Sequence, residues 1–157
     1  MKVFEDFQVG KTDVFGDYLI TEEEIIEFAT KYDPQPFHID PDFAAKSFHG
    51  QLIASGWMTG AITMRLICDH QLTDSTSIGS PGIDKLRWIR PVYAGDRLKA
   101  SVKVLETRES RSKPGMGIVN YEVITLNHKD EVVMSITTTG MFLTRAAYEA
   151  QESLKTP

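Results

Sequence analysis

The chain has 157 residues and a formal net charge of −5 at pH 7, and hydrophobic residues make up 41% of it. This length predicts one domain, residues 1–157, with a core of ordinary size. The acidic balance gives no electrostatic reason to expect a nucleic-acid partner. No apolar run approaches the roughly 20 residues that span a bilayer, and the N-terminal stretch has acids where a signal peptide is apolar. Cys68 is the only cysteine, which excludes a disulfide within the chain. We therefore expect a cytoplasmic protein with neither a membrane nor a nucleic-acid partner.

Residues up to about 70 carry helical patterns. In the first of these, Thr21 is followed three residues later by Glu24, which is the spacing of a capping box. Apolar residues then recur at positions 25, 28, 29 and 32, which places them on one face of a helix. Pro34 disfavours helical geometry at the preceding residue, so we expect this helix to end at Asp33.

The stretch YDPQPFHID, residues 32–40, follows this helix. Its two prolines predict a rigid turn whose backbone is not helical between Asp33 and Asp40. A short helix should come next, with Asp40 as its N-cap and Pro41 at its first position.

The stretch SGWMTGAITMRLICDH predicts a third helix. It has no wide polar face, so we expect it to be largely buried. Gly56 and Gly60 lie four residues apart on one side, where a strand or a ligand could approach the backbone closely. Ser55 and Thr59 lack the G-x-S-x-G context of a nucleophile, and helix capping explains Ser55.

The second half of the chain carries the alternating, β-branched pattern of antiparallel strands. A short amphipathic helix at about residues 145–154 ends the chain. One long helix followed by such strands predicts an α+β fold in which the sheet wraps around the helix. The four predicted strands are residues 82–92, 97–106, 118–127 and 131–144.

The run D-P-Q-P-F-H-I-D-P resembles the hydratase motif of the MaoC-like, (R)-specific enoyl-CoA hydratase family. The resemblance continues through LIASGWMTG, LRWIRPVYAGDRL and SRSKPGMGIV, and it covers residues from about 5 to 143. It implies a single hotdog domain, with an antiparallel sheet wrapped around a long central helix, assembled as a homodimer or a dimer of dimers. It also implies a hydro-lyase that needs no cofactor and that reversibly hydrates a trans-2-enoyl-CoA to a 3-hydroxyacyl-CoA.

Such a hydration needs a base for water, an acid for the α-carbon and a donor for the charge that develops on the thioester oxygen. The prolines restrict the turn, so that Asp33 and His38 can be directed at one water. By resemblance, these two side chains bind the water and the N–H of Gly56, at a helix start, polarises the thioester. We favour Asp33 as the base and His38 as the group that orients the water and relays the proton, while the division of acid and base roles stays open.

Four positions depart from the family's usual residues. The family usually has Gly at Tyr32, Asn at Gln35, a smaller aliphatic residue at Phe37 and His at Ser55. Because Gln35 and Phe37 are larger than the usual residues, we expect them to shape the substrate pocket.

The acyl-CoA substrate also needs cations for its phosphates. Arg87 or Arg90, and the loop that holds Arg111 and Lys113, are candidates. A solvated basic loop is the alternative. The acyl chain should lie along the apolar side of the central helix and contact Trp57, with core packing of Trp57 as the alternative.

Three other interpretations are weighed against this one. Asp33, His38 and Asp40 could in principle ligate a metal, but no second histidine has a supporting spacing, so we predict no metal. The same fold could also serve an acyl-CoA thioesterase or a non-catalytic subunit that binds acyl-CoA.

Overall fold

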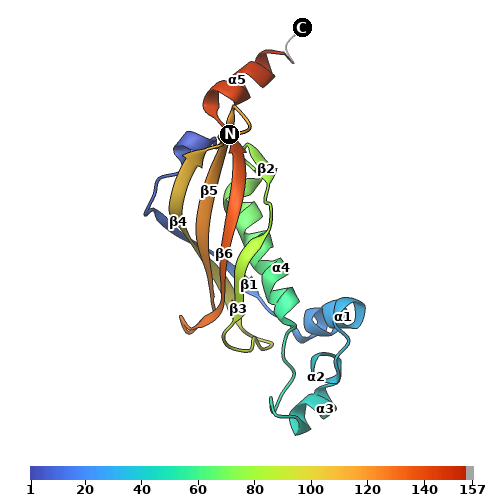
Figure 1. Ribbon diagram of the computed structural model, residues 1–157. Coiled ribbons are helices and arrows are strands. Elements are labelled where there is room, and N and C mark those ends of the chain that lie inside the picture. The colour runs from blue at the N-terminus through green and yellow to red at the C-terminus, as the bar shows by residue number, and fades with distance from the viewer. Residues whose placement is uncertain (155–157) are drawn as a thin grey trace.

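The computed structural model describes residues 1–154 (Figure 1). The longest helix has 12 residues, and no helix in this range has the length and apolar character needed to cross a membrane. The helices are α1 (Glu22–Tyr32), α2 (Pro36–Ile39), α3 (Pro41–Lys46), α4 (Gly56–Ile67) and α5 (Arg145–Ser153), with the short turns η1 (Phe4–Asp6) and η2 (Cys68–Leu72). The strands are β1 (Thr12–Leu19), β2 (Ser77–Gly79), β3 (Ile83–Trp88), β4 (Arg97–Glu109), β5 (Met116–Leu126) and β6 (Val132–Leu143).

The strands form one antiparallel sheet in the order β1-β4-β5-β6, and both β2 and β3 pair with β6 at the far edge. The sheet curls around α4, with α1–α3 at one end of that helix and α5 beyond the other end of the sheet (Figure 1). Alternation along β4 buries Leu98, Ala100, Val102 and Val104, as the sequence pattern predicts. Leu98 packs with Met58 of α4 in the larger hydrophobic cluster. The predicted α+β fold is therefore confirmed.

The helix boundaries confirm the predicted caps. The Thr21 side chain accepts a hydrogen bond from the Glu24 N–H, and α1 ends at Tyr32 with Asp33 as its C-cap. Asp40 accepts from the Phe43 N–H at 3.0 Å and begins α3.

Between these two helices the prediction of non-helical backbone is wrong. Residues Pro36–Ile39 form the helical turn α2. Proline is tolerated at a first helical position because its missing N–H would have no partner there, and Pro36 occupies that position.

The first strand, β1, was also not predicted. Gly16 lies within it at φ +90°, and the register with β4 shifts between Phe15 and Tyr18. A Cβ on Gly16 would lie 2.7 Å from a methyl carbon of Leu66, so the glycine allows both the irregular strand and the close approach of α4.

The expectation that α4 is largely buried holds on only one side. Trp57 is 59% exposed and Met64 is 48% exposed, and Ala61 between them is also exposed. These residues share one face of the helix. Met58 and Ile62, on another side of the helix, are buried in the core. The chain therefore leaves an apolar strip of α4 partly uncovered.

Candidate active site

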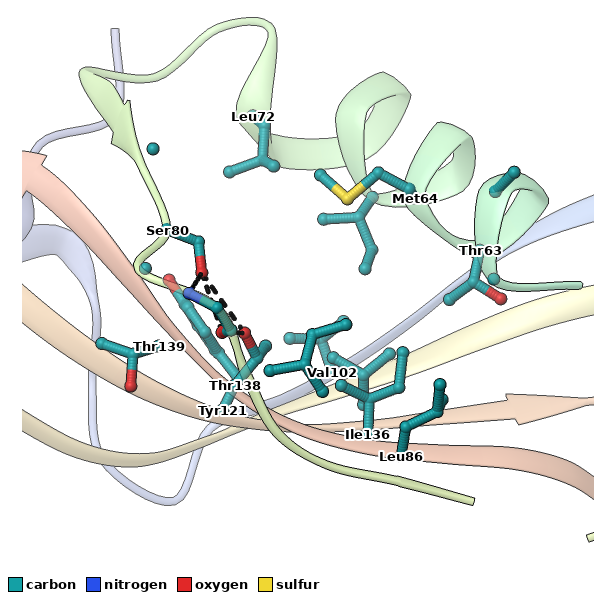
Figure 2. Close-up of a pocket in the computed structure, with 18 of the residues that line it drawn as sticks. Thr63, Met64, Leu72, Ser80, Leu86, Val102, Tyr121, Ile136, Thr138 and Thr139 are labelled. Atoms are coloured by element: carbon teal, nitrogen blue, oxygen red, sulfur yellow. Dashed lines mark hydrogen bonds between the residues drawn. The ribbon is translucent and has the colours of Figure 1, made fainter. Parts of the chain in front are cut away.

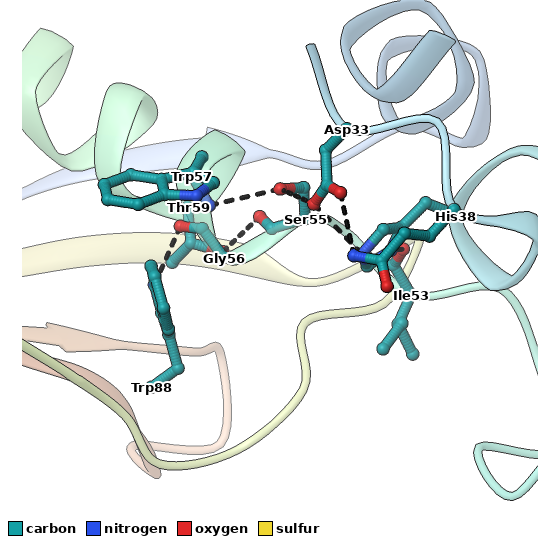
Figure 3. A network of polar contacts seen from close by, with 9 residues as sticks. Asp33, His38, Ile53, Ser55, Gly56, Trp57, Thr59 and Trp88 are labelled. Atoms are coloured by element: carbon teal, nitrogen blue, oxygen red, sulfur yellow. Dashed lines mark hydrogen bonds and ion pairs between the residues drawn. The ribbon is translucent and has the colours of Figure 1, made fainter.

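Asp33 and His38 meet at the start of α4 (Figure 3). Asp33 follows the last residue of α1, and His38 lies in α2. The helical turn of α2 folds the chain back, so that His38 Nε2 lies 3.4 Å from Asp33 Oδ2. The predicted convergence of these two side chains is therefore present in the structure.

The ring of His38 has a fixed orientation. Its Nδ1 lies 2.7 Å from the carbonyl oxygen of Ile53 in a buried contact. A carbonyl can only accept, so Nδ1 carries the hydrogen, and the neutral ring presents the lone pair of Nε2 toward Asp33. In this tautomer both atoms are hydrogen-bond acceptors, so a water placed beside them can donate to either one.

The Asp33 carboxylate is held on both oxygens. Ser55 Oγ donates to Oδ2 at 2.7 Å, and Gln35 Nε2 donates to Oδ1 at 2.8 Å. The hydrogen bond from Ser55 is the main cause that lowers the pKa of Asp33 below its ordinary value, and the hydrogen bond from Gln35 lowers it further. Asp33 is therefore ionised at neutral pH, and its carboxylate is a hydrogen-bond acceptor.

Ser55 has a second contact that the sequence interpretation missed. It caps α4 as predicted, accepting from the Trp57 N–H at 3.2 Å, and the same hydroxyl donates to Asp33. Its side chain has no exposed surface. The one available signal was its place directly before Gly56, where the family usually has another polar residue.

Gly56 is the first residue of α4, and its N–H has no hydrogen-bond acceptor among the described residues. An added Cβ would overlap the indole ring of Trp88, whose Nε1 donates to the Gly56 carbonyl at 2.8 Å. The predicted close approach of a strand to this glycine is thus confirmed, because Trp88 ends β3. The contact leaves a backbone donor beside Ser55 and no room for a side chain.

A pocket of about 620 Å³ runs from this point between α4 and the sheet. Gly56 and Trp88 line one end, and Leu72 and Phe142 line it farther along. Figure 2 shows its two walls, the helix with Met64 and the sheet with its apolar side chains. Its size is typical of small-molecule sites.

The three residues of this region that were predicted to contact the substrate lie in different surroundings. Trp57 lines this pocket and packs edge-on against Trp88, with 5.1 Å between ring centroids. Phe37 packs beside His38 at 4.5 Å between centroids and against the hydrophobic core. Gln35 directs its amide at Asp33. The observed contacts of Phe37 and Gln35 support the Asp33–His38 pair, and their contact with substrate stays a prediction.

The predicted cations lie far apart. Arg87 is exposed on β3, next to Trp88. Lys113 lies in the turn between β4 and β5, close to α5 and at the other end of the sheet from α1–α3 (Figure 1). One chain therefore does not bring Lys113 and Asp33 together.

The described residues contain no group of three or more His, Cys, Asp or Glu side chains that could hold a metal ion. Asp40, the second acid of this stretch, accepts a hydrogen bond from the Phe43 N–H in the first turn of α3. Its observed role is that of an N-cap.

Comparison with known proteins identifies relatives of this arrangement. The sequence model of the MaoC like domain matches residues 6–127. The structure of a MaoC-like dehydratase from Rhodospirillum rubrum is 37% identical with a TM-score of 0.84, covering 91% of this chain and 97% of that one. The 3-hydroxybutyryl-CoA dehydratase of Methylorubrum extorquens is 27% identical over 136 residues, which are 83% of this chain and 78% of the relative. YdeM of Bacillus subtilis, an uncharacterized protein, is 29% identical over 126 residues, which are 80% of this chain and 88% of YdeM. The sheet wrapped around α4 is the hotdog fold of these structures.

Proposed function

Because this chain belongs to the MaoC-like domain family, we propose that it catalyses the reversible hydration of a trans-2-enoyl-CoA to a 3-hydroxyacyl-CoA. The observation that carries the proposal is the pair of acceptors, Asp33 Oδ2 and His38 Nε2, 3.4 Å apart at the start of α4. Relatives named as dehydratases support the reaction class.

In the hydration direction, water donates to Asp33 and His38. Asp33 takes one proton as the water oxygen bonds to carbon 3, and the electron pair of the double bond moves toward the thioester oxygen. The proton on Asp33 then passes through His38 to carbon 2. The net reaction adds one water across the double bond. Asp33 is assigned as the base because it is ionised at neutral pH and lies beside His38 at the start of α4.

The charge that develops on the thioester oxygen needs a fixed donor. The N–H of Gly56 is such a donor, since it begins α4 and the positive end of the helix dipole lies there. Trp88 holds the carbonyl of the same residue, which fixes the orientation of its backbone.

A thioesterase on the same fold is the first alternative. Wild-type protein incubated with crotonyl-CoA distinguishes the two reactions, with absorbance of the enoyl group and free thiol measured together. Hydration removes the enoyl band and releases no thiol. Thiol release with an intact enoyl band would contradict the proposed reaction.

A subunit that only binds acyl-CoA is the second alternative. The variants Asp33→Asn and His38→Gln should lose hydration and still bind the substrate. Turnover equal to that of the wild type in both variants would exclude this pair as the active site.

We also propose that the protein is a homodimer. The outer edge of β3 has no partner strand among the described residues, and beside it lie the exposed side chains of Ile83, Trp88 and Trp57. Exposed strand edges and apolar patches are typical of association sites. Sedimentation should give twice the chain mass of 17.7 kDa or a multiple of it, and a monomer alone would contradict the proposal.

A further inference from the structure

One buried side-chain atom of the described residues lacks any hydrogen-bond partner, and it is the hydroxyl oxygen of Tyr121. Tyr121 lies on β5, is only 6% exposed and lines the pocket beside α4 (Figure 2). A buried hydroxyl without a partner destabilises a protein, and its presence calls for an explanation. A ligand that accepts this hydrogen bond supplies one.

The hydroxyls next to Tyr121 are directed elsewhere. Thr138, its register partner on β6, donates to the carbonyl of Gly82 at 2.8 Å. Thr139 donates to the side-chain oxygen of Asn120 at 2.8 Å. Tyr121 is therefore a buried side-chain donor of this pocket that the fold itself does not use.

The pocket also restricts the charge of its ligand. None of its lining residues is Asp, Glu, Lys, Arg or His. An ionised group placed beside the buried Tyr121 hydroxyl would have no counter-ion among the lining residues, which is unfavourable. Burial also raises the pKa of Tyr121, so its hydroxyl stays protonated and acts as a donor. The matching ligand atom is a neutral oxygen.

Strand register gives the distance between Tyr121 and the end of the pocket at Gly56, where the proposed reaction takes place. Trp88, which contacts Gly56, pairs with Met134, and Tyr121 pairs with Thr138. Four residues along β6 correspond to about 13 Å. Between the two ends, Gly60 of α4 lines the pocket, and a Cβ on it would meet nothing within 4 Å, so the helix leaves this stretch open.

We propose that this pocket binds the acyl chain of the substrate, and that Tyr121 donates a hydrogen bond to a neutral oxygen on the distal part of that chain. The substrate class is then a medium-length enoyl thioester with a hydroxyl or carbonyl group far from the thioester. This inference rests on the proposed function, because it takes Gly56 as the position of the thioester.

The test measures binding of saturated acyl-CoA thioesters, which cannot be hydrated, by titration calorimetry. Each chain length is used in a pair, one with a plain terminus and one with a terminal hydroxyl. The wild-type protein is compared with Tyr121→Phe and with Tyr148→Phe, a matched control on α5. At the chain length that reaches Tyr121, we expect the hydroxylated chain to bind about tenfold more tightly to the wild type and to the control. Tyr121→Phe should bind both chains equally, and its Tm should not fall.

Equal binding of the two chains at every length, or a preference that survives in Tyr121→Phe, would overturn the proposal. Tightest binding of a carboxyl-terminated chain would do the same. The proposed reaction is scored separately with crotonyl-CoA, whose chain is too short to reach Tyr121. Hydration of crotonyl-CoA without any binding preference refutes the pocket assignment alone, and a binding preference without hydration refutes the reaction alone.

Discussion

The two ends of α4 differ in how their polar groups are used. At its start, Asp33 accepts from Ser55 and Gln35, and His38 donates to Ile53, so the reacting groups are held by other polar groups. Along the rest of the helix the pocket is apolar, and Tyr121 keeps an unused donor. In the proposed function, the start of the helix carries the reaction and the pocket selects the substrate. Substitutions at the two ends should therefore have separable effects.

The largest effect is expected at Asp33. Asp33→Asn keeps the size of the side chain and an acceptor for Ser55 but removes the base, so kcat on crotonyl-CoA should fall by about 10²–10⁴-fold. Asp42→Asn in α3 is the matched control and should retain full activity. Activity of Asp33→Asn within a few-fold of the control would show that Asp33 is not the base.

The next effect concerns the contact of Gly56 with Trp88. In Gly56→Ala the new methyl group overlaps the indole ring, and such overpacking costs about 1–3 kcal/mol of unfolding free energy. Movement of Trp88 or of the helix start should also displace the backbone donor and lower kcat. Denaturant unfolding and crotonyl-CoA kinetics measure the two effects. An unchanged kcat in a folded Gly56→Ala protein would argue against a role for this N–H.

A smaller effect is expected at Ser55. Ser55→Ala removes the cap of α4, which should lower the unfolding free energy by about 0.5–2 kcal/mol. It also removes the main hydrogen bond that lowers the pKa of Asp33. The Asp33 pKa should rise toward its ordinary value. Because the base acts when ionised, the acidic limb of kcat/KM that reports Asp33 should move to higher pH. Ser55→Thr keeps a hydroxyl and should restore the wild-type profile, whereas a loss of helix capping alone would leave the profile unchanged in all three proteins.

Ser55 should also affect how the stability of the protein depends on pH. A carboxylate with a lowered pKa in the folded state adds stability above the unfolded pKa of about 4, and this stability is lost as the pH falls through the folded value. The stability difference between wild type and Ser55→Ala should therefore be larger at pH 7 than at pH 3. Denaturant unfolding at both pH values measures it. A difference that grows on acidification would contradict the assigned direction of the Asp33 pKa.

The smallest effect is expected at Gly60, the second glycine of α4. Gly60→Ala adds a methyl group in open space within a helix, so the protein should gain about 0.5–1 kcal/mol of unfolding free energy. In the same variant, crotonyl-CoA should be hydrated normally and longer enoyl chains should show a raised KM. Equal KM changes at all chain lengths would remove Gly60 from the acyl pocket.

Much of this arrangement could be predicted from local sequence. The caps at Thr21, Asp40 and Ser55 depend on residues two or three positions away. The strand β4 can be predicted from the simple alternation of apolar and polar residues. β1 was missed because Gly16 interrupts its alternation. The turn α2 was missed because proline disfavours helix in general but is tolerated at a first position.

The contacts that complete the site could not be predicted from local patterns. Ser55 and Asp33 are 22 residues apart, and Trp88 and Gly56 are 32 apart. Both pairs form because the sheet and the helices converge on the start of α4. The unpaired hydroxyl of Tyr121 likewise becomes visible only when its neighbours on β6 are known.

The most direct test of the proposed reaction follows the oxygen of water. Wild-type protein, Asp33→Asn and Asp42→Asn are each incubated with crotonyl-CoA in water labelled with oxygen-18, and the products are identified by mass spectrometry. We predict that wild type and Asp42→Asn place the label on carbon 3 of an intact 3-hydroxyacyl-CoA, and that Asp33→Asn does not. Label in the carboxylate of a free acid, with CoA released, would show thioester hydrolysis and contradict the proposed function.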